Sequence, residues 1–396
     1  MLGDAGPPDL GVPDAGPPIP CQFDQLDPIL TLTSTESADA ALARVDGAFA
    51  AVITHRDEVG SFQTYLYLVP DQGEPPEPVV LTASIPPPVT LRRTLVTSDG
   101  AQLWAAIRAL RGETGSAFEY ETWLARYAPG MEPTLRRLSS SLGFPDALAP
   151  NALGGVDLFF SQSSGPNSPP SLVRFRPNLS IAERVEPSTV VDNPGPTIWA
   201  PPSFLLQARG PYGDLQLWRG TLGFDGAPNV AGEVFPEKRW ADLHLGRPHA
   251  SPDGQVEFPA WHRDFTTEDE DPKPWRTAIY RCCDAGLEQR WFTMAQAERP
   301  QLAKMDACGY ILGAGVGALS ETNPTTIDGS LWWLEEDEDG RLRVTREWLE
   351  VLSSPPGGCH TNLHVAASPK EAAALWVDGC NAGRQTFFRR IRFSQP

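Results

Sequence analysis

The sequence lacks the short motifs that would assign a common chemistry to it. It contains no G-x-S-x-G nucleophile turn, no G-x-x-x-x-G-K-[ST] phosphate loop and no H-E-x-x-H metal pair. No cysteine belongs to a C-x2-C pair of the kind that binds zinc. The run GAGVG (313–317) is rich in glycine, but no helix is predicted after it, so it lacks the helix N-terminus that holds a phosphate group.

Long apolar runs, basic residues and helical periodicity are also scarce. No run approaches the roughly 18 apolar residues of a membrane span. Lys and Arg number 32 against 50 Asp and Glu, which gives a formal net charge of −18. A surface of that sign repels nucleic-acid phosphates and anionic lipid, so we expect neither as a partner. The only helix-like stretch, ADAALARV (38–45), is short.

Proline, glycine and tryptophan are plentiful instead. The chain has 41 Pro, 35 Gly and 12 Trp, and 41% of its residues are apolar. That apolar content suffices for a folded core. Pro and Gly recur between short apolar runs, a pattern typical of many strands joined by tight turns.

A weak repeat runs through the chain after residue 28. Seven short apolar strands follow turns at intervals of 45 to 64 residues, and their central residues are Phe49, Trp104, Phe159, Phe204, Phe258, Ile311 and Leu375. An aromatic-rich strand such as QTYLYLV (63–69) follows each of them, and a more polar strand usually comes next. With the strand before each anchor, every unit has four strands. The pattern predicts an all-β fold, a single seven-bladed β-propeller over residues 22–396.

The two ends of the repeat complement each other. The last unit reaches Pro396 without an outer strand, while PILTLTS (28–34) is a strand with no unit of its own. We therefore expect this N-terminal strand to complete the last blade and close the ring, which removes an exposed sheet edge.

The turns resemble those of TolB-like and WD40-like propeller repeats. Ser-Pro-Asp-Gly stands at 251–254, with partial forms at 98–100 and 368–369. The Asp caps the backbone and the Gly adopts a positive φ, so the resemblance implies a propeller and no catalytic role.

Residues 1–21 are expected to form a tether outside the propeller. Residues 3–20 nearly duplicate an Asp-Ala-Gly-Pro-Pro unit, which predicts an extended, polyproline-like segment. The segment resembles the spacers that follow the lipid-bearing cysteine of surface lipoproteins in some Gram-negative bacteria. That resemblance implies an extracytoplasmic location, at the cell surface or in the periplasm, with a lipid anchor in a removed N-terminal region. The alternative is a cytosolic protein with an extended arm.

Six cysteines, an even number, suit an oxidising compartment. Cys359 and Cys380 flank the first two strands of unit seven, so propeller topology favours a bridge between them. The same topology favours a second bridge from Cys283 to Cys308, although Cys282 could replace Cys283. Cys21 would then pair with the cysteine that is left.

The adjacent pair Cys282–Cys283 has a second interpretation. A vicinal disulfide there would resemble that of the quinoprotein dehydrogenases, which are Trp-rich propellers. The chain has no copy of their repeated Trp-docking motif, so we treat redox chemistry as a third candidate behind two others.

A group of aromatic residues is expected on one face of unit five. The loops that enter the first strands and join the second to the third strands define this top face, and the expected ligand-binding residues are Trp199, Trp240, Trp261, His262 and Trp275. The acidic run 268–271 lies among them. Rings beside carboxylates suit a sugar, a cation or a peptide. The alternative is that the rings pack between blades and the acidic run is a solvated loop.

No metal or cofactor is expected, with calcium as the one possible exception. His360 and His364 share one strand four residues apart, so they lie about 13 Å from each other and cannot bind one ion. His244 takes the corresponding place in unit five. The run EEDEDG (335–340) is rich in oxygen ligands but breaks the register of a calcium loop.

These observations favour a non-catalytic binding or scaffold propeller that engages a protein or glycan through its top face. The alternative is a secreted glycoside hydrolase or lyase with carboxylates at the mouth of the central channel. The acidic candidates for that role are Asp157, Asp242, Asp264 and Asp378.

Overall fold

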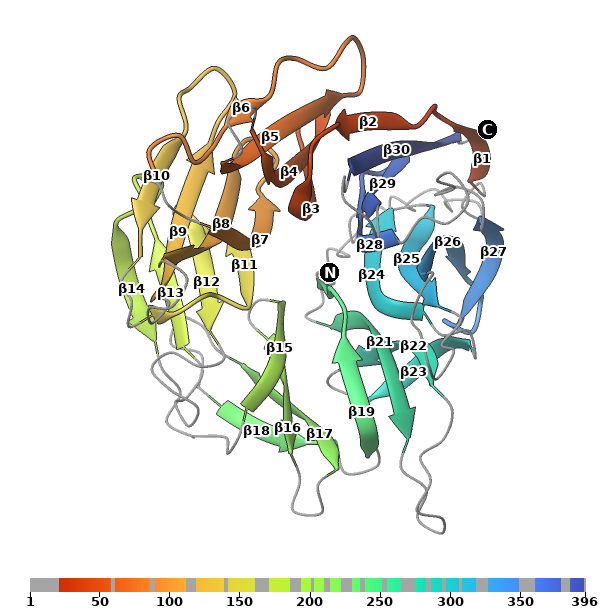
Figure 1. Cartoon of the computed structure of the whole chain (residues 1–396). Helices are drawn as coiled ribbons and strands as arrows, with labels where there is room; N and C mark the ends of the chain where they lie inside the picture. Colours follow the sequence, from red (N-terminus) through yellow and green to blue (C-terminus); the bar gives the residue numbers. More distant parts are fainter. Residues whose placement is uncertain are drawn as a thin grey trace, which may run out of the picture.

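The regular structure of the chain consists of β-strands arranged around one axis (Figure 1). The structure is a computed structural model. Its described residues are 21–57, 61–85, 90–111, 119–138, 142–160, 171–185, 194–200, 203–209, 214–221, 230–235, 239–250, 255–264, 275–282, 286–293, 297–305, 308–317, 327–348, 360–378 and 385–394. These residues contain no helix long and apolar enough to cross a membrane.

Four sheets contain four antiparallel strands each, hydrogen-bonded in sequence order. The first two comprise β3 (Ser37–Val45), β4 (Ala48–Arg56), β5 (Phe62–Pro70) and β6 (Val79–Val80), then β7 (Thr90–Ser98), β8 (Leu103–Arg111), β9 (Glu119–Tyr127) and β10 (Thr134–Arg137). The other two comprise β11 (Ala147–Pro150), β12 (Val156–Phe160), β13 (Ser171–Phe175) and β14 (Ile181–Val185), then β24 (Ala297–Met305), β25 (Gly309–Gly317), β26 (Ile327–Glu336) and β27 (Leu342–Trp348).

The expected count of seven blades is wrong, because the described strands form six sheets. Units four and five share one nine-stranded sheet, in which Leu215 pairs with Trp240 and so joins β17 to β19. Both residues pack into one hydrophobic cluster with Leu205 and Leu217, which holds the two strand ends together. The strands of this sheet are β15 (Pro194–Ala200), β16 (Ser203–Arg209), β17 (Leu215–Thr221), β18 (Val230–Val234), β19 (Trp240–Leu245), β20 (His249–Ala250), β21 (Val256–Asp264), β22 (Arg276–Cys282) and β23 (Glu288–Thr293).

The sixth sheet joins the two ends of the chain, and we call it the closing sheet. It contains β28 (His360–Ala367), β29 (Glu371–Asp378) and β30 (Gln385–Ser394), with β1 (Gln22–Leu26) and β2 (Leu30–Thr33) both paired with β30. Leu30 lies opposite Phe388, which confirms the expected role of the segment 28–34. Buried Thr386 also donates a hydrogen bond of 2.8 Å to Ser37 of β3. The closing sheet is thus linked to the sheet that follows it in the ring.

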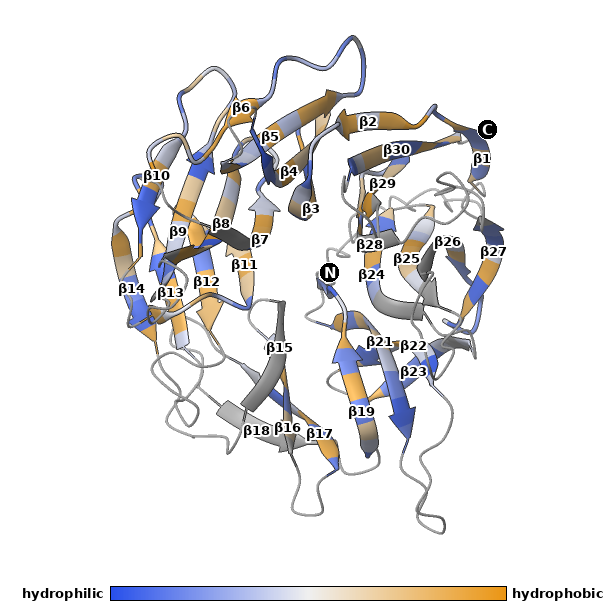
Figure 2. Ribbon diagram, in the orientation of Figure 1, coloured by the Kyte–Doolittle hydropathy of each residue, from blue (hydrophilic) through white to orange (hydrophobic). Residues whose placement is uncertain are grey.

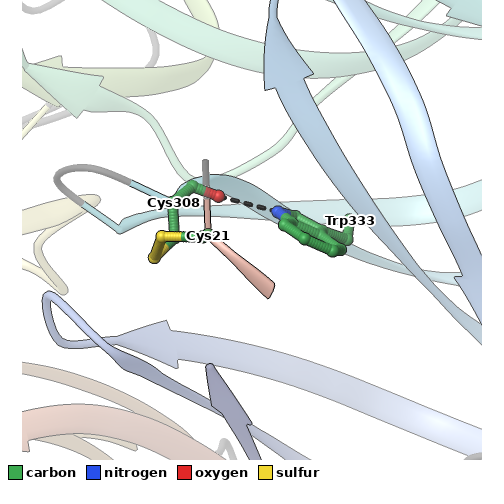
Figure 3. Close-up of a disulfide and its surroundings, with 3 residues drawn as sticks. All are labelled: Cys21, Cys308 and Trp333. Carbon is green, nitrogen blue, oxygen red and sulfur yellow. Dashed lines mark hydrogen bonds between the residues drawn. A yellow bond between two sulfur atoms is a disulfide. The ribbon is translucent and has the colours of Figure 1, made fainter. Parts of the chain in front are cut away.

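A disulfide between Cys21 and Cys308 connects the start of the described chain to the β24–β25 turn (Figure 3). The predicted Cys283–Cys308 bridge is therefore wrong. Pairing of β1 with β30 brings Cys21 against the core cluster that includes Cys308 and Trp333. The Trp333 indole donates a 2.7 Å hydrogen bond to the Cys308 carbonyl. Buried Cys282 is also disulfide-bonded, whereas Cys283, Cys359 and Cys380 lie outside the described residues.

The core lies between neighbouring sheets. Each sheet stands radially, so both faces of its middle strands are covered. Every residue of β12 is buried, for example, whereas β10 at the rim is largely exposed and hydrophilic (Figure 2). The seven sequence anchors, listed above as Phe49 through Leu375, are all buried. The repeat therefore marks the core correctly even though the sheet count differs.

Removal of the Cys21–Cys308 bridge is expected to destabilise the fold by about 4 kcal/mol. The bridge closes a separation of 287 residues, and long loops lose the most entropy on cross-linking. Cys21→Ser, Cys308→Ser and the double variant should lower the free energy of unfolding by similar amounts, measured by chemical denaturation. Equal stability of the wild type and the double variant would contradict this role.

Candidate functional site

Strand β21 separates the predicted site residues onto two faces of its sheet. Side chains alternate along a strand, so Ala260, His262 and Asp264 share one face, while Trp261 and Arg263 share the other. The first face packs toward the cluster that contains Phe258 and Tyr280. The second face carries the accessible aromatic residues.

Trp240 and His262 belong to the buried face and have an exposed fraction of 1% each. The His262 Nε2 atom lies 2.8 Å from the Tyr280 hydroxyl, and the Asp264 carboxylate lies 3.1 Å from Nδ1. Burial raises the pKa of Tyr280, with the Asp264 charge as a second cause. These two predicted ligand-binding residues therefore lie in the core and do not reach solvent.

Three rings on the opposite face stack on one another, and we call them the aromatic cluster: His244, Trp261 and Trp275. The ring centroids of Trp261 and Trp275 are 3.8 Å apart, and His244 stacks on Trp261 at 5.0 Å. His244 is exposed and both indoles are half-buried. The cluster thus brings side chains from β19, from β21 and from the residue before β22 together in one aromatic surface.

An ion pair borders the aromatic cluster. The Arg263 guanidinium lies 4.9 Å from the Trp275 ring centroid, and its Nε donates to the Asp242 carboxylate at 2.7 Å. Both charged side chains are about one-third exposed. An apolar ring surface with a donor and an acceptor at its edge can stack on a sugar ring and bond its hydroxyls.

Parts of the predicted site lie outside the described residues. These are the acidic run 268–271 and the side chains of Trp199, His360 and Asp378. Of the five predicted ligand-binding residues, the structure brings Trp261 and Trp275 together on accessible surface.

The predicted carboxylates do not converge. Asp157 lies in β12 and is 5% exposed, where Arg174 binds both its oxygens at 3.0 Å. Asp242 pairs with Arg263, and Asp264 lies 3.4 Å from Arg276 on the other face of the sheet. A glycosidase needs two carboxyl groups that face each other across the bond to be cleaved. These three do not provide that arrangement.

The acidic run 335–340 folds around its own backbone. The Asp337 carboxylate accepts hydrogen bonds from the amides of Asp339 and Arg341 and from Arg343 Nε, and the pKa of Asp337 is lowered by these contacts. Within the ranges given above, no group of three His, Cys, Asp or Glu side chains is arranged to hold a metal ion.

Sequence reasoning missed a second histidine–aromatic group, in the sheet β3–β6. The His55 Nε2 atom lies 2.8 Å from the Tyr67 hydroxyl, Nδ1 lies 2.8 Å from the Thr35 hydroxyl, and Tyr65 stacks on the imidazole at 4.3 Å. Burial lowers the pKa of His55 and raises that of Tyr67 to about 12. The available signal was the alternation of QTYLYLV (63–69), which places Tyr65 and Tyr67 on one face.

Comparisons with known proteins support the fold alone. No protein-family profile and no curated protein matches the chain. An ulvan lyase of polysaccharide lyase family PL25 superposes with a TM-score of 0.50 at 10% identity, over 92% of this chain and 95% of that one. Trypanosoma rangeli sialidase in complex with sialic acid gives 0.47 at 12%, over 93% and 57%. A GH43_1 enzyme from Xanthomonas citri gives 0.40 at 11%, over 80% and 93%.

The chain therefore spans a little more than half of the sialidase and nearly all of the ulvan lyase. At 10% identity, the superposition on the ulvan lyase supports the β-propeller fold alone.

Stacking of Trp261 on Trp275 should produce an exciton couplet in the far-ultraviolet circular dichroism spectrum. A couplet needs both rings, so Trp261→Phe, Trp275→Phe and the double variant should all reduce it equally. Trp123→Phe, which removes a half-buried indole from another sheet, should leave it intact. Independent, additive losses in the two single variants would show that the rings are not stacked.

Proposed function

We propose that this protein is an extracytoplasmic, carbohydrate-active propeller that holds a glycan against the aromatic cluster. The stacked rings of Trp261 and Trp275 carry this proposal. The two indoles stack at 3.8 Å with exposed His244 beside them, and the ring surface that this stack leaves uncovered can pack against the apolar face of a sugar ring. The fold shared with a polysaccharide lyase over nearly the whole chain supports the same substrate class.

The charges and the disulfide fit this location and this ligand. Disulfides persist in oxidising compartments, and the Cys21–Cys308 bridge lies in the core. Arg263 and Asp242 border the rings with a donor and an acceptor for sugar hydroxyls. A chain with a net charge of −18 also repels anionic polymers in general, so an acidic glycan would need a local cation such as Arg263.

Elimination is the reaction that we favour, because the three candidate carboxylates whose side chains are described, Asp157, Asp242 and Asp264, are paired with arginines. Eliminative cleavage of a uronate glycan needs a base for the proton next to the carboxylate and an acid for the leaving oxygen. Tyr67 can take the substrate proton while its own hydroxyl proton passes to neutral His55 across the 2.8 Å contact in the same step, so no free phenolate forms; it then donates the abstracted proton to the leaving oxygen and recovers its own from His55. Half-buried Tyr67 is the accessible end of this pair, whereas the similar His262–Tyr280 pair is fully buried.

The binding proposal is tested with a panel of neutral and uronate-containing polysaccharides. The intrinsic tryptophan fluorescence of the wild type should change saturably with at least one of them. Trp261→Ala and Trp275→Ala should each weaken binding about tenfold or more, since a stacking contact contributes about 1–2 kcal/mol. Trp123→Ala is the matched control and should bind as the wild type does. Equal affinity in all three variants would exclude the aromatic cluster as the binding surface.

The reaction is tested by the ultraviolet absorbance of the unsaturated uronate product. His55→Gln and Tyr67→Phe should each lower the rate about a hundredfold or more, because each removes one partner of the proton transfer. Tyr280→Phe deletes the corresponding hydroxyl of the buried pair and should retain activity. Saturated reducing ends as the only products would instead establish hydrolysis.

A further inference from the structure

The backbone around Arg247 holds this residue in a fixed position next to β24. Strand pairing is interrupted between β19 and β20. Gly246 lies at this point and packs so closely against β24 that a Cβ atom would lie 1.9 Å from the Pro300 carbonyl oxygen. The Gly246 amide donates a 2.8 Å hydrogen bond to the Pro259 carbonyl. The Arg247 backbone forms an isolated parallel β-bridge with Gln301 of β24. Only glycine at 246 permits this approach, which fixes Arg247 between two sheets.

The side chain of Arg247 reaches beyond these two sheets. Its Nη1 atom donates a 3.0 Å hydrogen bond to the Leu42 carbonyl of β3, in a third sheet. Electrostatic coupling to His364 of β28 brings in the closing sheet. The first strand β28 contacts both β24 and β3. Arg247 therefore lies where four sheets meet.

The positive charge of Arg247 has no negative partner in the part of the chain that the structure describes. Other arginines do have one: Arg174 binds Asp157 and Arg392 binds Asp27, each at 3.0 Å. Among the described residues, Arg247 makes one hydrogen bond, to a neutral carbonyl. The surrounding protein lowers the pKa of its guanidinium, although part of the residue surface stays open to solvent. A guanidinium has five donors, so most of them have no partner in the described part of the chain.

The titratable neighbours do not neutralise this charge. Burial and the Arg247 charge lower the pKa of His364 to about 4, so the imidazole is neutral at physiological pH. Asp39 of β3 is engaged elsewhere: burial raises its pKa to about 7, its carboxylate accepts from the Thr94 amide of β7, and the arginine charge that acts on it is that of Arg93.

We propose that Arg247 and the inner strand edges around it form a binding site for a small carboxylate. A planar carboxylate can accept two parallel hydrogen bonds from the guanidinium, the geometry that arginine favours. Its negative charge offsets that of Arg247, which has no ion-pair partner among the described residues. The carboxylate comes from a free acid such as acetate or from the uronate group of an acidic sugar, and these two sources are distinguishable by experiment. The site is separate from the aromatic cluster and does not depend on the proposed carbohydrate activity.

The test measures the unfolding midpoint of the wild type against sodium acetate, sodium glucuronate and glucose, with sodium chloride at matched ionic strength. A ligand of the folded state raises the midpoint in a saturable way. We expect acetate to do so and glucose to have no effect. A response to glucuronate equal to or stronger than that to acetate assigns the site to acidic sugars, and a weaker response assigns it to free acids. An identical, non-saturating response to acetate and chloride would overturn the proposal.

Two variants identify the residue responsible. Arg247→Gln should weaken the acetate response at least tenfold, whereas Arg247→Lys, which keeps the charge but loses the planar fork, should give an intermediate affinity. Wild-type acetate affinity in Arg247→Gln would show that the anion binds elsewhere and would refute the site. If Arg247→Gln does not fold, the comparison of Arg247→Lys with the wild type decides, since unchanged affinity in that variant would equally refute it. Trp261→Ala serves as a control and should retain the full acetate response.

Discussion

The pairing of β30 with both N-terminal strands is the interaction on which the rest of the molecule depends. Without β1 and β2, the closing sheet would have three strands and an open edge at β30. Arg392 binds Asp27, and Thr386 bonds Ser37, so polar contacts secure the pairing as well. The arrangement of the sheets around the axis, and with it the position of Arg247, requires that this ring be closed. The disulfide at Cys21 reinforces the same junction covalently.

Much of this fold could be predicted from the sequence, because a repeat with buried anchors such as Phe49 and Phe258 depends on local patterning. The number of sheets could not. It depends on whether Leu215 pairs with Trp240 across a loop, which is a tertiary contact. The partner of Cys308 was wrong for a similar reason, since strand order alone does not determine where the chain before β1 runs.

The sequence placed Trp240, Trp261, His262 and Trp275 together on one face. The structure brings Trp261 and Trp275 into contact, but Trp240 and His262 lie on the buried face because strand alternation and a bulge after Trp240 decide orientation. His244 had been considered only as a metal ligand. The partners of His55 come from two segments, β5 and the linker that contains Thr35, and no spacing rule reveals such a contact.

The alternation along β21 has a consequence for how this protein can diverge. Positions 261 and 263 face the accessible surface, while 258, 260 and 262 face the core. Substitutions at the first set change the accessible surface and leave the core cluster in place, so related chains should vary there more freely. A deletion of one residue within β21 would exchange the two faces, placing Arg263 in the core and His262 outside. Evolution of this surface can therefore proceed by replacement but not by change of length.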